Sequence, residues 1–172
     1  ALTRGGERVL DRIQVERFKR LLRQVLPVAD AADALAEEAA DWTDSNALVD
    51  GLGGAEDTEY QDRRTSNQPF AHVSELRALR SATRELWLVR DDALPFTRYL
   101  AALPEGTRIN VNTAPEAVLA SLVQGMDSRV AGVIIASRAQ APFETVESLL
   151  ALQEIADLAE PVRTELKDAI VV

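Results

Sequence analysis

The stretch RINVNTAPE, residues 108–116, carries the most informative local pattern of this chain. Ile109 and Val111 alternate with polar residues, as in a short strand. The following residues 113–116 match a helix capping box, with threonine as the cap, proline in the first turn and glutamate reaching back. We therefore expect a short strand that leads directly into a helix ending near Val123.

Further helices are expected on the C-terminal side of this stretch. Gly125 breaks the first helix, and Asp127 can cap a second helix that reaches about Arg138. Thr145 can cap a shorter helix, and a last helix is expected over residues 161–168. This half of the chain is therefore predicted to be a series of capped helices.

Helices are also expected on the N-terminal side, where apolar residues recur at three- and four-residue steps. One helix begins at a cap of Asp11 and is ended by Pro27. The apolar stripe of the next helix is Ala32, Leu35, Ala39 and Trp42. Short helices are expected over residues 74–79 and 83–89. The prediction is a mainly α fold with little β-structure, a single multi-helix globular domain over residues 1–172.

Composition excludes several kinds of protein. The 172 residues carry a net charge of −9, one histidine and no cysteine. Disulfides, thiolate metal sites, cysteine nucleophiles and imidazole metal clusters are therefore ruled out. No apolar run approaches the ~18–20 residues that span a bilayer, and the negative charge argues against nucleic-acid binding. Because the chain ends on the β-prone run at 169–172, we expect a domain excised from a longer protein, and an ordinary C-terminal strand is the alternative explanation of these residues.

Acidic residues dominate one interval, because no Lys or Arg lies between Arg23 and Arg63. The carboxylates in this interval are Asp30, Asp33, Glu37, Glu38, Asp41, Asp44, Asp50, Glu56, Asp57, Glu59 and Asp62. Their repulsion can be relieved by solvation, by arginines from elsewhere in the fold, or by a bound cation. Those of the helix, from Asp30 to Glu38, are expected to form a solvated face.

The acidic loop, about residues 41–72, lacks periodicity and is too long for a passive connection. It combines carboxylates with glycines that let backbone carbonyls turn inward, and Ca²⁺ takes six to eight oxygen ligands in such flexible loops. It is not an EF-hand, because counting from Asp44 places Ala55 where the bidentate glutamate should stand. A solvated acidic loop and a calcium site both remain open at this point.

The segment of about residues 108–151 resembles the helix–hairpin–helix family, which includes DNA-binding domains. In that family a Gly-hydrophobic-Gly hairpin directs backbone amides at a phosphate. Here the hairpin is Gly125-Met126-Asp127, so an acid stands where the phosphate would lie. We expect the same packing unit without the phosphate function, and a DNA-binding module is the alternative function. Neither a nucleic-acid site nor a catalytic residue is assigned.

Several motifs in a fixed order carry a second resemblance. They are Ala40-Asp41-Trp42-Thr43-Asp44, Gly53-Gly54-Ala55-Glu56-Asp57 with Tyr60, Asn67-Gln68-Pro69-Phe70, Val73-Ser74-Glu75-Leu76-Arg77, the stretch from Thr107 to Pro115, and Pro142-Phe143. With these motifs the chain resembles the minor pseudopilin K family of type II secretion systems in Gram-negative bacteria, from about Val15 to Leu150.

The resemblance implies a fold and a function. Family members have an N-terminal membrane-spanning helix and a small pilin-like sheet, between which a large helical domain is inserted, and this chain resembles the inserted domain. The family is not enzymatic: it caps the tip of the pseudopilus in protein export, in complex with the I- and J-type minor pseudopilins. The resemblance thus implies a periplasmic domain of an inner-membrane protein, anchored through a helix that this chain lacks. Contact with exported proteins stays open.

The resemblance also implies a calcium ion near the acidic loop. The expected ligands are Asp44, Glu56 and Asp57, with Asp50, Asp62 and Asn67 as weaker candidates. The spacer between the first two departs from the family's Asp- and Pro-rich version, so a second ion is not expected.

Overall fold

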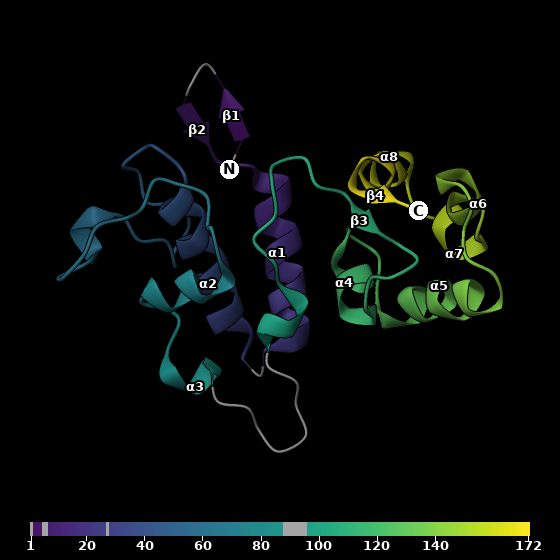
Figure 1. Cartoon of the computed structure of the whole chain (residues 1–172), viewed down its shortest axis with the longest axis horizontal. Helices are drawn as coiled ribbons and strands as arrows, with labels where there is room; N and C mark the ends of the chain where they lie inside the picture. The colour runs from purple at the N-terminus through teal and green to yellow at the C-terminus, as the bar shows by residue number, and fades with distance from the viewer. Residues whose placement is uncertain (1, 5–6, 27, 88–95) are drawn as a thin grey trace. The chain divides into compact units, whose positions relative to one another are not determined.

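The computed structural model describes residues 2–4, 7–26, 28–87 and 96–172 (Figure 1). The chain divides into two compact units, residues 1–105 and 106–172. The sequence led us to expect one domain over residues 1–172, and that the two units act as one domain stays a prediction. Within the described residues, no helix combines the length and the apolar character needed to cross a membrane.

The first unit begins with a small hairpin and two long helices. Strand β1 (Leu2–Arg4) pairs antiparallel with β2 (Glu7–Val9), and α1 (Arg12–Val25) and α2 (Ala29–Thr43) follow. Asp11 caps α1 as predicted, since its carboxylate accepts from the backbone amides of Ile13 and Gln14. Pro27, the predicted end of this helix, lies outside the described residues.

Short helical turns complete the first unit. They are the 3₁₀ helices η1 (Asp57–Glu59), η2 (Val73–Ala78) and η3 (Phe96–Tyr99), and the α-helix α3 (Arg84–Trp87). The predicted short helices are thus present, although residues 88–89 of the second lie outside the described part. The apolar stripe of α2 is buried with residues from α1, η2 and η3, among them Leu22, Leu76 and Phe96. The acidic loop overlaps α2 at residues 41–43, and its remainder contains η1 and otherwise irregular backbone.

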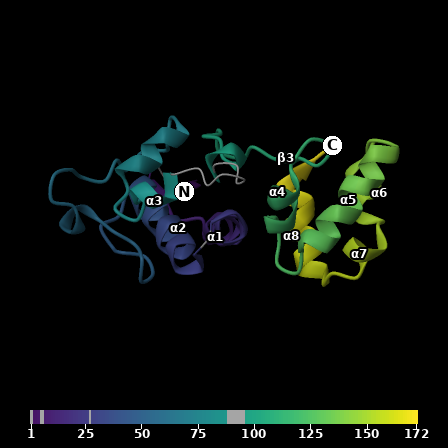
Figure 2. The same cartoon turned by 90° about the horizontal axis from the view of Figure 1, so that it is seen from below.

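The second unit is helical around one pair of short strands. Its helices are α4 (Glu116–Ser121), α5 (Ser128–Gln140), α6 (Val146–Leu150), α7 (Gln153–Ala156) and α8 (Glu160–Ala169). Strand β3 (Ile109–Asn110) pairs parallel with β4 (Ile170–Val171), and this pairing joins the two ends of the unit. Figure 2 shows α4 to α8 grouped together, and their buried faces form a core of their own. The mainly α fold with little β-structure is confirmed.

The predicted capping box at 113–116 is wrong. Helix α4 begins at Glu116 with Pro115 at its N-cap and without a side-chain cap. The backbone amides of Thr113 and Ala114 instead donate to the carbonyl of Asn110, so the chain makes a turn before the helix. The helix also ends at Ser121 rather than near Val123. The order of helix, glycine turn and helix is nevertheless the predicted one, with a backbone φ of 87° at Gly125.

The predicted caps of α5 and α6 are confirmed. Asp127 accepts a hydrogen bond from the backbone amide of Val130, and Thr145 accepts one from that of Ser148. Both caps satisfy amides that have no partner within their own helix.

Replacing Asp127 by alanine is expected to weaken α5 locally. The loss of this N-cap should lower the free energy of opening of α5 by about 1 kcal/mol. Amide hydrogen exchange along α5 measures that quantity, with Glu144→Ala as a control because Glu144 is exposed and lies outside the helices. Equal loss of protection in the two variants would contradict the assignment of Asp127 as the cap.

Candidate metal centre

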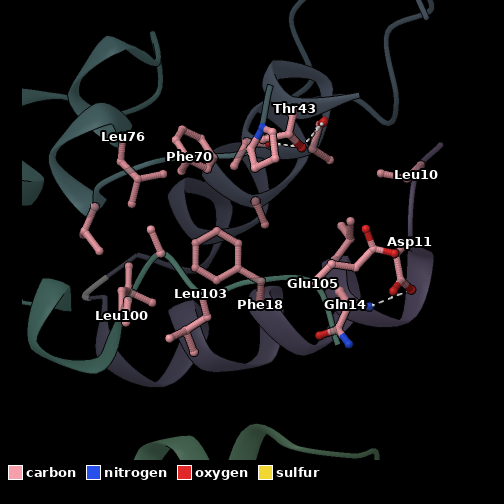
Figure 3. Close-up of a pocket in the computed structure, with 18 residues that line it drawn as sticks. Leu10, Asp11, Gln14, Phe18, Thr43, Phe70, Leu76, Leu100, Leu103 and Glu105 are labelled. Atoms are coloured by element: carbon pink, nitrogen blue, oxygen red, sulfur yellow. Dashed lines mark hydrogen bonds between the residues drawn. The ribbon is translucent and has the colours of Figure 1, made fainter. Parts of the chain in front are cut away.

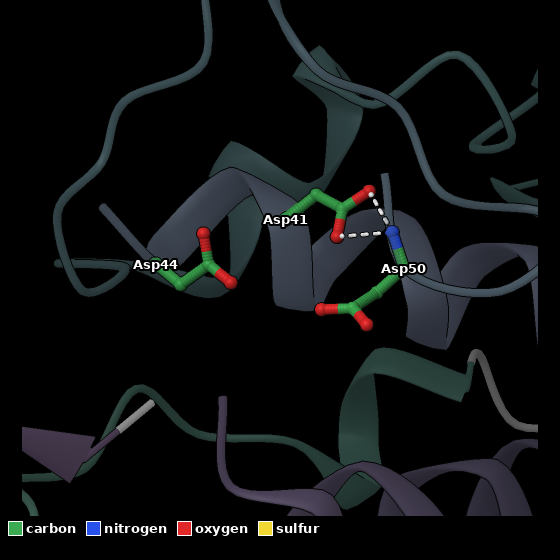
Figure 4. Close-up of side chains that lie close together, drawn as sticks. All are labelled: Asp41, Asp44 and Asp50. Atoms are coloured by element: carbon green, nitrogen blue, oxygen red, sulfur yellow. Dashed lines mark hydrogen bonds between the residues drawn. The ribbon is translucent and has the colours of Figure 1, made fainter. Parts of the chain in front are cut away.

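A group of carboxylates gathers where α2 ends and the acidic loop begins. Carboxylate oxygens of Asp41, Asp44 and Asp50 all lie within 4.8 Å of one another (Figure 4). Asp41 belongs to the last turn of α2 and Asp44 follows that helix directly, and both are fully buried. The backbone amide of Asp50 donates to both carboxylate oxygens of Asp41, at 3.2 and 3.3 Å. This contact returns the loop to the helix and brings Asp50 into the group.

Glu56 is a fourth carboxylate of this site. Its side chain is 4% exposed, and its Oε2 faces the hydroxyl of Thr65 at 3.5 Å. Its Oε1 is buried and accepts no hydrogen bond from the described part of the chain. A buried acceptor without a partner costs about 1–3 kcal/mol. Glu56 therefore provides an oxygen that a cation could use.

The electrostatics of the group disfavour its charged form. The pKa of Asp41 is raised to about 7, mainly by burial and also by the nearby charges of Asp50 and Asp44, against the lowering effect of the amide hydrogen bond from Asp50. Burial, with the charges of Asp41 and Asp44, likewise raises the pKa of Glu56 to about 7. The pKa of Asp44 is raised mainly by burial. These shifts are those of carboxylates crowded together without enough positive charge.

A basic residue reaches the edge of this group. Arg12 Nη2 lies 3.6 Å from Asp50 Oδ1, but the side chain of Arg12 is 83% exposed. Such an exposed ion pair contributes little. A divalent cation at the centre would neutralise more of the negative charge than this arginine can.

The loop can approach Asp41 closely because of a glycine. A Cβ atom at Gly54 would collide with the Asp41 carboxylate and with the backbone carbonyl of Asp50. The adjacent Gly53 donates its backbone amide to Glu37 Oε2 at 2.7 Å, which fixes the loop to α2 a second time. The two glycines allow a close contact between backbone and carboxylates that a side chain would prevent.

The other expected ligands have different surroundings. Asp57 is exposed and accepts from the backbone amide and the hydroxyl of Thr65, at 2.8 Å each. Asp62 is exposed and pairs with Arg63. Asn67 lies near the end of α2, where its backbone amide donates to the carbonyl of Trp42. The structure thus brings Asp44, Asp50 and Glu56 to the site and directs Asp57 and Asp62 elsewhere.

Asp41 belongs to the site, although the sequence analysis does not name it as a ligand. It lies within a helix, and a helical carboxylate is typical of a solvated surface. Asp41 and Asp44 are three residues apart, and residues at this spacing share one face of a helix. This spacing could have predicted Asp41 as a ligand.

The acidic face of α2 is only partly solvated: Asp30 is exposed, as predicted, whereas Asp33 and Glu37 are half-buried. Glu38 is fully buried and accepts from the hydroxyl of Tyr60 at 2.5 Å and from the amides of Arg80 and Ser81 at 2.5 and 2.7 Å. Glu37 accepts from Lys19 Nζ at 2.7 Å as well as from Gly53. Irregular loops leave backbone amides that need acceptors. The carboxylates of α2 supply these acceptors and thereby hold two loops in place.

In the absence of a cation, the stability of the first unit is expected to fall as the pH rises. Asp41 and Glu56 titrate near 7 in the folded protein and near 4 in the unfolded chain. The folded state thus binds more protons than the unfolded chain. The stability gained from these protons is complete below about pH 4 and is lost as the pH rises through about 7. Between pH 5 and 8 the free energy of unfolding should fall on the order of 3 kcal/mol.

Urea unfolding in a metal chelator, at constant ionic strength, measures this pH dependence. A double variant Asp41→Asn, Glu56→Gln removes both titrating groups and should flatten the profile. A wild-type stability that is constant or rising between pH 5 and 8 would contradict the electrostatic description of the site.

The first unit also contains an apolar cavity of about 380 Å³ (Figure 3). Phe18, Phe70, Leu76 and Leu100 line it together with alanines of α2. Among its lining residues, Asp11 already uses its carboxylate as the cap of α1. This mainly apolar lining is typical of a packing defect or a docking hollow, rather than of a catalytic site.

The helix–hairpin–helix-like segment does not offer a phosphate site at its hairpin. The carboxylate of Asp127 occupies the N-terminus of α5, where it accepts from Val130. A phosphate at this place would meet a negative charge instead of free amides. This contact disfavours the alternative of a DNA-binding module.

Two family models match the chain, and both are described as type II secretion system (T2SS), protein K. One matches residues 2–105 and the other residues 109–172. The interval between the two matches coincides with the division between the compact units.

Known proteins give the same result. The chain is 33% identical over 135 residues to the type II secretion system protein K of Pseudomonas aeruginosa PAO1. This match covers 76% of this chain and 38% of that protein. A similar fold occurs in the crystal structure of the GspK-GspI-GspJ complex from the enterotoxigenic Escherichia coli type 2 secretion system, with a TM-score of 0.72 and 24% identity. That match covers 99% of this chain and 58% of the other. The chain thus spans less than two thirds of the relatives that it matches.

Proposed function

This chain belongs to the type II secretion system protein K family, and from that premise we propose that it is the helical part of a minor pseudopilin at the tip of the pseudopilus. The observation that carries the proposal is the match of both compact units to models of the same family protein. A bulky helical domain at the end of a helical filament stops further subunits from adding above it. The role is therefore structural, with no catalytic step.

The partners we propose are the I- and J-type minor pseudopilins. This proposal is supported by the similar fold in the GspK-GspI-GspJ complex. The chain would lie on the periplasmic side of the inner membrane, anchored through a helix outside these 172 residues. Contact with exported proteins is compatible with this position at the tip.

We further propose that calcium is bound by the carboxylate group at the end of α2. Asp44 and Asp50 are expected ligands that lie in this group with Asp41, and Glu56 lies near enough for the charges of Asp41 and Asp44 to raise its pKa. The unpartnered oxygen of Glu56 and the raised pKa values of Asp41 and Glu56 support the fit. Calcium, when bound, supplies the positive charge that these carboxylates lack. The residues themselves hold the acidic loop against α2 through the amides of Asp50 and Gly53.

Deletion and complementation test the function. In the source bacterium, a strain that lacks the full-length protein should fail to release type II substrates, and the full-length gene should restore release. The restored protein should also purify with the I- and J-type pseudopilins from detergent extracts. Normal secretion in the deletion strain, or a full-length protein that purifies without either partner, would contradict the proposal.

A further inference from the structure

The charge of the first unit reverses sharply along the chain. The interval from residue 24 to residue 62 contains eleven carboxylates and no basic residue. The next interval, residues 63–84, contains five arginines and one glutamate. All five arginines are exposed. In a protein of net charge −9, a run of exposed arginines favours partners of opposite charge.

Three of these arginines line a hollow of about 450 Å³ beside η2. They are Arg63, Arg77 and Arg80, and they surround it together with Tyr60 and Leu79. The two segments that form its walls, residues 59–63 and 77–80, are brought together where Arg63 Nη1 donates to the carbonyl of Ala78 at 3.2 Å. We name this hollow the arginine pocket.

Each guanidinium of the arginine pocket is held by a different neighbour. Arg63 makes a two-point contact with Asp62, at 2.8 and 2.9 Å. Arg77 lies 4.7 Å above the ring of Trp87. Arg80 Nε lies 3.7 Å from the buried carboxylate of Glu38. Guanidinium groups held in this way lose less conformational freedom when they bind a ligand.

The carboxylates in the lining are already engaged by local donors. Asp62 is paired with Arg63, and Glu59 accepts from the amide of Glu56 and the hydroxyl of Thr58. A guanidinium has five N–H donors, and Arg63 makes three hydrogen bonds with them, two to Asp62 and one to the carbonyl of Ala78. Donors of the three arginines therefore remain for a ligand at the open side of the pocket.

We propose that the arginine pocket binds an acidic segment of a partner protein, a short run of Asp and Glu. Planar carboxylates suit the guanidinium fork, which binds them through two parallel hydrogen bonds. Several carboxylates along one peptide match several arginines around one hollow. A long nucleic acid fits less well, because the net charge of −9 repels a phosphate polymer. The lining of this pocket shares no residue with the carboxylate group proposed for calcium, and the proposal goes beyond the proposed function.

Titration with a defined peptide tests this site. The probe is acetyl-hexaglutamate amide, added to the calcium-loaded protein at about 20 mM salt, where surface electrostatics are little screened, and binding is followed by NMR chemical shifts. Shifts should concentrate at residues 59–63 and 77–80. Arg63→Gln and Arg77→Gln should each weaken binding by about tenfold, as expected for loss of one charge-assisted contact. Arg129→Gln, an exposed arginine of α5, should leave it unchanged.

Several outcomes would overturn the site. One is that hexaglutamate does not bind, and another is that acetyl-hexaglutamine amide binds equally well. A third is that Arg63→Gln and Arg77→Gln both bind the peptide as tightly as the wild type, although both variants melt at the wild-type temperature. Inorganic phosphate that binds as tightly as the peptide would replace the acidic segment by a general anion site. Calcium-dependent stability is measured separately in each variant, so a failure here is distinct from a failure of the proposed function.

Discussion

Replacing Asp41 by asparagine is expected to stabilise the calcium-free protein and to abolish its stabilisation by calcium. The raised pKa of Asp41 means that the fold disfavours its charge. Asparagine keeps a carbonyl oxygen for the amide of Asp50 and removes the charge, so the repulsion from Asp44 and Asp50 decreases. The same change removes a calcium ligand. In the wild type, calcium at a hundredfold excess over its dissociation constant should add ~2.7 kcal/mol to the free energy of unfolding, and the variant should lose this gain.

Thermal unfolding at pH 7.5, in calcium and in a chelator, measures both effects. Wild type should melt several degrees higher in calcium, because ~1 kcal/mol corresponds to a shift of roughly 2–4 °C in a domain of this size. Asp41→Asn should melt at one temperature in both conditions, above that of calcium-free wild type. Asp157→Asn, an exposed change in the second unit, is the control. A variant that loses stability in the chelator, or keeps the full calcium response, would contradict the proposed site.

Replacing Glu38 by alanine is expected to destabilise the first unit strongly. Glu38 is fully buried and accepts from the hydroxyl of Tyr60 and from two backbone amides, of Arg80 and Ser81. Its removal leaves these three donors unsatisfied and leaves Arg80 without its buried partner. Breaking such a buried network costs about 3–5 kcal/mol.

Urea unfolding followed by tryptophan fluorescence measures this loss, because Trp42 and Trp87 both lie in the first unit. Glu38→Gln keeps one acceptor oxygen and should lose less stability than the alanine variant. Asp30→Ala, at an exposed position of the same helix, should change little. A loss below about 1 kcal/mol in Glu38→Ala, the size of an ordinary hydrogen bond, would show that Glu38 does not fix the loop.

The helices and their caps could be predicted from the sequence because they depend on nearby residues. Asp11, Asp127 and Thr145 each cap a helix through an amide two or three residues away. The predicted capping box at 113–116 has the same pattern. There, however, the carbonyl of Asn110 accepts from the amides of Thr113 and Ala114, and the chain makes a turn instead. A local pattern therefore fails where a competing local hydrogen bond is available.

The roles of the α2 carboxylates could not be predicted in the same way. Glu38 meets Arg80 and Ser81, more than forty positions later in the chain, so no local pattern reveals its burial. The crowding of acids predicts a cation, which stays a prediction, and the structure places Asp44 and Asp50 together with Asp41, with Glu56 near enough for their charges to raise its pKa. Spacing alone could not separate these from Asp57, which Thr65 engages.

Crystals of this protein grown in millimolar calcium provide the most direct test of the central claim, that a divalent cation neutralises the carboxylates at the end of α2. An anomalous difference map should place one ion within about 2.3–2.6 Å of carboxylate oxygens of Asp44 and Glu56, the distance range of calcium ligands. An ordered acidic loop with no ion at this place, and with arginines paired to these carboxylates instead, would contradict it.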